Sequence, residues 1–248
     1  MKHTMYVAVL LLIFSYSFSA CKKEPNPPVS PATGYVTGKI TDANGHPLSS
    51  VKVTVEHTVW EDVYVFATTN NNGTYTSAIP TSPDGDWTAK AQISKSAYGQ
   101  DYTFDLAPNS TDAFNRFDTA HRDFIWKLSG EKPAKDTYYG AHIDLYQFGT
   151  DVPMNKVKLI LTPTENTLID GSPATSIERT VEDVAGTFMV KDIPIGKYTV
   201  KAVYPGKTLL LDNRHDDHDA PAVEQPAVFG KYGYLGETEY NVEFWLSE

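Results

Sequence analysis

One short run, His215 to Asp219, holds the side chains of this sequence that are best suited to bind a metal ion. It reads His-Asp-Asp-His-Asp, and imidazole combined with carboxylate is a ligand set that Zn²⁺ accepts. We take His215, Asp217, His218 and Asp219 as candidate ligands. Their spacing matches no established zinc signature, so a solvated acidic loop stays open as the alternative. Apart from this divalent cation, no cofactor is predicted.

Five aromatic residues in or near expected loops are candidates for stacking on a ligand. Sugar-binding sandwiches stack pyranose faces on Tyr and Trp, while Asp, Asn and His side chains bond the hydroxyl groups. The candidates, which have such polar neighbours, are Trp60, Tyr98, Tyr102, Tyr232 and Tyr234. For each ring, the alternative is that it covers one end of the hydrophobic core.

Motifs for catalysis are missing from the sequence. It contains no H-E-x-x-H, no G-x-S-x-G and no glycine-rich phosphate loop. We therefore predict a protein that is not an enzyme. A metal-dependent hydrolase is the third hypothesis, and it would require the His215 run to meet a further ligand in a cleft.

Charge and cysteine content exclude several classes of partner and site. The 248 residues have a formal net charge of −10 and a single cysteine, Cys21. Nucleic acid is not expected as a partner, because phosphate binding needs a basic stripe. One cysteine also excludes an internal disulfide framework and a cysteine-based zinc site.

Residues 1–20 read as a lipoprotein signal peptide. Lys2 precedes an apolar run from Met5 to Phe14, which is too short to span a bilayer as a mature helix. Small residues directly before Cys21 resemble a bacterial lipobox, which implies acylation of the Cys21 sulfur and attachment to a membrane. An ordinary signal peptide with an incidental cysteine is the alternative. Residues 21–32 are polar and proline-rich, as in an extended tether.

The stretch from Gly34 to Val55 predicts two strands joined by a turn. Val51, Val53 and Val55 alternate with polar residues, which places them on one face of a half-buried strand. The same pattern returns from Gly140 to Leu161, with Val157, Leu159 and Leu161 in the valine positions. No sustained helical periodicity occurs after the signal peptide. We predict an all-β chain with two domains of about a hundred residues, 33–130 and 136–248, whose closing strands hold Trp126 and Trp245 as counterparts.

These repeats also resemble a known family. The pattern G-x-I-x-D-x-x-G-x-P-L-x-x-V-x-V-x-V begins at Gly38, and I-P-x-G-x-Y-x-V begins at Ile193. Together they resemble the carboxypeptidase regulatory-like domain. The resemblance implies tandem transthyretin-like (Greek-key) β-sandwiches that are not themselves catalytic. With the lipobox, the chain resembles surface lipoproteins of Bacteroidota, which implies export and a lipid anchor in the outer membrane.

Two long inserts, 94–123 and 205–239, are not required by that pattern. Long connections on a rigid sandwich are frequent binding sites, so we expect them to supply ligand contacts. Extra strands are the alternative. The favoured function is a cell-surface binding module with a carbohydrate ligand. The alternative function is a structural or adhesion subunit that docks other surface proteins, which would show a large apolar patch or an open strand edge.

Overall fold

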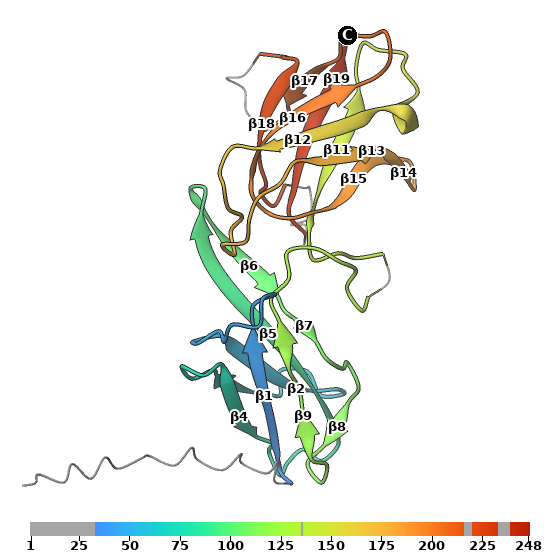
Figure 1. Cartoon of the computed structure of the whole chain (residues 1–248). Coiled ribbons are helices and arrows are strands. Elements are labelled where there is room, and N and C mark those ends of the chain that lie inside the picture. The colour runs from blue at the N-terminus through green and yellow to red at the C-terminus, as the bar shows by residue number, and fades with distance from the viewer. Residues whose placement is uncertain (1–32, 135, 216–219, 233–238) are drawn as a thin grey trace, which may run out of the picture. The chain divides into compact units, whose positions relative to one another are not determined.

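The computed structural model describes residues 33–134, 136–215, 220–232 and 239–248. In these residues the strands form four sheets, and each sheet takes its strands from one half of the chain (Figure 1). The all-β prediction is confirmed. The helical structure of the described residues is the short 3-10 turn η1, Met154–Lys156.

The strands divide into an N-terminal and a C-terminal set. The N-terminal set is β1 (Tyr35–Thr41), β2 (Lys52–His57), β3 (Tyr64–Thr68), β4 (Thr74–Ala78), β5 (Asp86–Ala97), β6 (Gln100–Asp105), β7 (Ala107–Pro108), β8 (Phe114–Asn115), β9 (Ala120–His121) and β10 (Phe124–Ile125). The C-terminal set is β11 (Ala141–Gln147), β12 (Lys158–Pro163), β13 (Ile177–Thr180), β14 (Glu182–Val184), β15 (Thr187–Ile193), β16 (Lys197–Val203), β17 (Leu210–Asn213), β18 (Glu224–Val228) and β19 (Asn241–Ser247).

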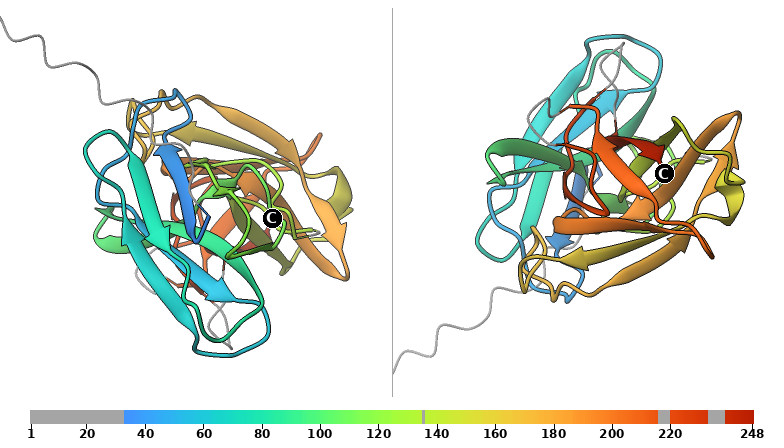
Figure 2. Two further views of the ribbon diagram at one scale, coloured as in Figure 1. Left: turned by 90° about the horizontal axis from the view of Figure 1, so that it is seen from below. Right: turned by 90° about the horizontal axis from the view of Figure 1, so that it is seen from above.

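The two sets have similar but not identical sheets. The N-terminal sheets run β4-β1-β10-β7 and β3-β2-β5-β6, with β9 beside β1 and β8 beside β5. The C-terminal sheets run β14-β15-β11-β19-β17 and β13-β12-β16-β18. Their buried faces contribute to one core, as in β-sandwiches, and Figure 2 shows the strands from below and above. The described residues all fall within one compact unit, and the boundaries predicted for two domains stay a prediction.

The predicted core positions are confirmed in both sets. Val53 lies opposite Ala91 in the β2–β5 pair, and Leu159 lies opposite Ala202 in the β12–β16 pair. The alternating side chains are at most 1% exposed: Val51, Val53, Val55, Val157, Leu159 and Leu161. Period-two alternation therefore identified the face of each strand that packs inward.

The match between the two closing tryptophans is wrong. Strand β10 ends at Ile125 and Trp126 beyond it is buried. Trp245 instead lies within β19, opposite Tyr146 of β11, and the two rings are 5.6 Å apart. The neighbours of Trp245 in β19 (Asn241–Ser247), Phe244 and Leu246, are buried, so Trp245 lies on the opposite face of that strand. The alignment of the repeats does not show this difference of face.

Both inserts are built into the sheets as strands. Insert 94–123 holds the end of β5 and all of β6 to β9, and insert 205–239 holds β17 and β18. The order of these strands along the chain differs between the two sets. In the N-terminal set, β6 extends the sheet of β5, and β7 then joins β10. In the C-terminal set, β17 joins β19, and β18 then extends the sheet of β16. The structure thus favours the alternative interpretation, in which the inserts are extra strands that complete the sheet edges.

The Asp192 carboxylate forms hydrogen bonds with the segment that connects the two sets of sheets. Its carboxylate accepts hydrogen bonds from the Gly130 N–H at 2.8 and 3.0 Å and from the Gly140 N–H at 3.3 Å. The φ of Asp192 is +57°, a conformation that costs a non-glycine residue about 1–3 kcal/mol. These bonds offset that strain. In the described part of the chain, no helix is long and apolar enough to cross a membrane.

Candidate functional site

Several predicted site residues lie outside the described residues. These are the acylation site Cys21, the candidate metal ligands Asp217, His218 and Asp219, and the candidate aromatic residue Tyr234. The anchor and most of the metal run therefore stay predictions. In the described residues, no group of three His, Cys, Asp or Glu side chains is arranged to hold a metal ion.

The structure brings two residues of the second insert together. The rings of His215 and Tyr232 stack at 3.9 Å with an interplanar angle of 6°. His215 Nε2 lies 3.1 Å from Glu243 Oε2, and Arg214 Nη1 donates to the same oxygen at 2.8 Å. These side chains therefore make their contacts with one another, and one face of the Tyr232 ring is covered.

The sheet surface beside this pair is also occupied by its own side chains. The Arg214 guanidinium lies over the rings of Tyr146 and Trp245, 4.2 and 4.5 Å from their centroids. Asp144, on the same row as Glu243, is buried and accepts from Asn241 through Oδ2, while its Oδ1 has no partner in the described residues. This surface is polar, but its aromatic rings are covered by the arginine.

Tyr102 does not present an open ring. It is fully buried, and its hydroxyl donates to the carbonyl oxygen of Phe229 at 2.9 Å. Burial raises the pKa of the Tyr102 phenol to about 12, which keeps the hydroxyl protonated as a donor. Tyr98 is half-buried, with its ring edge against Tyr102. Both rings pack with the hydrophobic core. This agrees with the alternative interpretation, in which each ring covers one end of the core.

Trp60 is the predicted aromatic residue that is open to solvent. It lies in the turn between β2 and β3, and 59% of its surface is exposed. Tyr64, at the start of β3, is 48% exposed. Both residues line an open hollow of about 410 Å³, which is formed by residues 56–64. A ring that is bordered by a hollow can stack on a flat ligand without a conformational change.

Carboxylates surround this hollow. Glu56, Glu61 and Asp62 line it together with Trp60 and Tyr64, and we call these five residues the Trp60 platform. Lys90 forms an ion pair with Glu56 at 2.5 Å. In the described part of the chain, Glu61 and Asp62 form no ion pair, so the platform keeps a negative charge and free hydrogen-bond acceptors.

The sequence analysis did not single out Tyr64 and its neighbour Phe66. Phe66 is 54% exposed, and its ring centroid lies 5.0 Å from that of Tyr64. The signal was present, because Val63 to Ala67 is apolar on both faces of a strand. One face of such a strand packs against the core, and the other face then exposes aromatic side chains.

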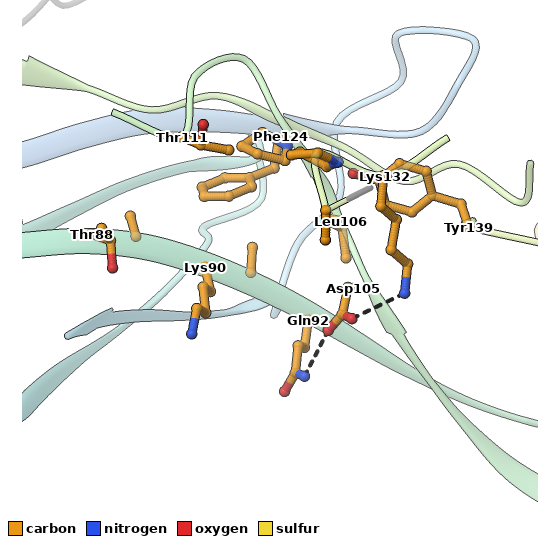
Figure 3. A pocket seen from close by; sticks show the side chains of 14 residues that line it. Thr88, Lys90, Gln92, Asp105, Leu106, Thr111, Phe124, Lys132 and Tyr139 are labelled. Atoms are coloured by element: carbon orange, nitrogen blue, oxygen red, sulfur yellow. Dashed lines mark hydrogen bonds and ion pairs between the residues drawn. The ribbon is translucent and has the colours of Figure 1, made fainter. Parts of the chain in front are cut away.

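A larger hollow of about 510 Å³ lies between β5 and the strands that follow it (Figure 3). Asp105 occupies its rim, where it accepts from Gln92 at 2.9 Å and from Lys132 at 3.4 Å. Phe124 and Leu106 line the hollow but are buried. Gln92, Asp105 and Lys132 are thus already paired with one another, and the described lining presents no exposed ring comparable with Trp60.

Comparisons with known proteins identify no family. No family model matches the chain, and no curated protein matches it. Among solved structures, the Bacillus anthracis TIE protein is 14% identical with a TM-score of 0.31, and the match covers 86% of this chain and 33% of that one. The minor pilin GBS52 of Streptococcus agalactiae is 13% identical with a TM-score of 0.24, covering 87% and 96%.

A B repeat unit of the collagen-binding surface protein of Staphylococcus aureus is 13% identical with a TM-score of 0.23, and the match covers 88% of this chain and 100% of that one. The chain spans about a third of the length of the TIE protein that it matches. At these TM-scores, none of the likenesses bears on function. The carboxypeptidase regulatory-like resemblance stays a prediction.

Proposed function

We propose that this chain is a non-catalytic binding module that holds a carbohydrate on the Trp60 platform. The observation that carries the proposal is the exposure of Trp60 and Tyr64 beside the carboxylates Glu61 and Asp62, which form no ion pair with a described residue. Aromatic faces stack on the apolar faces of sugar rings, and carboxylates accept hydrogen bonds from sugar hydroxyls. The platform lies at the end of a paired strand, which supports it rigidly.

The charge of the platform favours neutral sugars over acidic ones. Among the described residues, Glu56 has a cationic partner, Lys90, and the other two carboxylates of the platform have none. The whole chain has a net charge of −10. A uronate or sulfated sugar would meet like charge at close range, which is unfavourable at moderate ionic strength. We therefore expect neutral oligosaccharides to bind and polygalacturonate not to bind.

Replacement of Trp60 by alanine should weaken binding most. Loss of a central aromatic contact costs roughly 2 kcal/mol, which is about a thirtyfold increase in Kd. Isothermal titration of the soluble chain with cellohexaose, xylohexaose, maltohexaose and chitohexaose measures this. Phe148→Ala is the matched control, because Phe148 is 66% exposed but lies outside the platform. Equal binding by the Trp60→Ala and Phe148→Ala variants would contradict the proposal.

A second candidate function is the docking of another surface protein along β3. This strand is at the edge of its sheet, with β2 on one side only. Thr69 N–H donates to Val51 and His57 N–H donates to the Val63 carbonyl, so by alternation Phe66 directs its backbone N–H and C=O to the free edge. An open edge with an exposed Phe66 suits strand addition. If none of the four oligosaccharides binds, the result would favour the docking of a surface protein along β3.

The proposal places the module on a membrane surface through Cys21. Residues Ser19 and Ala20 and the lone cysteine support acylation at that position. Cys21→Ser should abolish incorporation of a fatty-acid probe and release the chain from the membrane fraction, since stable anchoring depends on the acyl chains. Ser19→Thr serves as a control that keeps Cys21. Unchanged labelling of the Cys21→Ser variant would show that Cys21 is not acylated.

A further inference from the structure

A buried histidine lies directly beneath the turn that bears Trp60. His57 is the last residue of β2 and is 7% exposed. Its Nδ1 atom lies 3.1 Å from the Val59 backbone nitrogen and 3.2 Å from the Trp60 backbone nitrogen. Both backbone groups are N–H donors, so Nδ1 must be the acceptor. The imidazole thus fixes the backbone at Trp60 itself.

The other side of the ring is held just as closely. Nε2 lies 3.2 Å from the carbonyl oxygen of Asp84, which can only accept, so Nε2 bears the proton. The ring edge packs against Trp87 with centroids 5.0 Å apart. A Cβ atom on Gly85 would lie 2.7 Å from Nε2, so the backbone there approaches as close as glycine permits. These contacts select one tautomer, neutral imidazole with its proton on Nε2.

We propose that His57 is the positioning residue of the Trp60 platform, and that protonation of its Nδ1 releases the turn. A proton on Nδ1 would face the N–H groups of Val59 and Trp60 and leave both without an acceptor. The effect of this protonation on ligand binding rests on the proposed function. The arrangement of the turn itself is independent of any ligand.

The acidic residues around His57 do not take over its role as the hydrogen-bond acceptor for the turn. The acidic residues nearest in the chain are Glu56 on β2, Glu61 and Asp62 in the turn, and Asp84 and Asp86 before β5. In the described part of the chain, none of them forms an ion pair with the ring, and Asp84 and Asp86 contact His57 and Thr58 through their carbonyl oxygens. An imidazolium would therefore lose two acceptor contacts and gain no carboxylate partner at this site.

Nitrogen-15 NMR of the ligand-free chain tests the positioning role directly. In the neutral form, the His57 ring should show a protonated Nε2 and an unprotonated Nδ1. The amide and indole signals of Trp60 should then move with the same midpoint as the His57 ring as the pH falls. Signals of Trp60 that stay constant while His57 titrates would overturn the proposal, as would a ring that stays neutral until the chain unfolds.

Two substitutions separate positioning from simple packing. His57→Asn places an amide oxygen near the position of Nδ1 and cannot titrate, so it should keep the Trp60 signals and remove their pH dependence. His57→Leu fills the space but lacks the acceptor, so its Trp60 signals should be shifted at every pH. The control is His46→Asn, at a histidine whose side chain is 75% exposed. A pH response that persists in the His57→Asn variant would overturn the proposal.

Binding of cellohexaose gives the functional readout. Over the pH range in which the His57 ring takes up a proton, the wild-type affinity should fall roughly tenfold, as expected for loss of hydrogen bonds that leaves backbone donors unsatisfied. The His57→Asn variant should lose little over the same range. If cellohexaose fails to bind but the NMR response is seen, the positioning role stands and the carbohydrate proposal fails. Binding with no difference in pH dependence between wild type and His57→Asn would overturn the positioning role alone.

Discussion

Replacement of residues 207–236 by a short Gly-Ser linker is expected to unfold the C-terminal sheets. The deletion removes β17 and β18, which are the edge strands beside β19 and β16. Among the described residues, it also removes four buried hydrophobic side chains: Leu209, Leu211, Ala227 and Phe229. Loss of the larger three costs about 2–5 kcal/mol each, and the sum approaches the roughly 5–15 kcal/mol by which a typical domain is stable.

The same deletion removes contacts to the N-terminal set. The Phe229 carbonyl accepts hydrogen bonds from Tyr102 at 2.9 Å and from Gln100 at 2.6 Å, and Tyr102 would then be a buried donor without a partner. Thermal unfolding followed by circular dichroism measures the effect. Replacement of residues 216–219 alone is the matched control, because it keeps both strands. A deleted chain that unfolds cooperatively at the wild-type temperature would show that β17 and β18 are dispensable.

Substitution of Val53 by aspartate is expected to have the second large effect. Val53 is fully buried in the middle of β2, opposite Ala67 of β3 and Ala91 of β5. None of these neighbours can pair with a carboxylate. Burial of an unpaired charge or its forced protonation should cost about 4 kcal/mol or more, which should leave the N-terminal sheets largely unfolded at physiological temperature.

Urea denaturation measures that difference when it is compared with Thr54→Asp. Thr54 is the next residue of β2 and lies on the opposite, partly exposed face, where a carboxylate stays hydrated. The midpoint of the Val53→Asp variant should fall sharply, and that of the Thr54→Asp variant should change little. Equal midpoints for the two variants would mean that the face assignment of β2 is incorrect.

Local patterns in the sequence determined the fold class and the inward face of the main strands. The alternation of Val51, Val53 and Val55 requires only that side chains point to opposite sides of a strand, a property of the backbone alone. The same reasoning located Val157, Leu159 and Leu161. It also listed Trp60 among five candidate aromatic residues, but it did not separate Trp60 from the other four.

The tertiary structure alone decided the role of the inserts and the arrangement of the site. Tyr102 and Trp60 are both aromatic residues with polar neighbours, yet one is buried and the other exposed. The difference depends on whether a distant segment covers the ring, as Tyr240 does for Tyr102 with ring centroids 5.0 Å apart, and no local pattern contains that contact. His57 likewise owes its place to Asp84, Gly85 and Trp87, which reach it only because β2 pairs with β5.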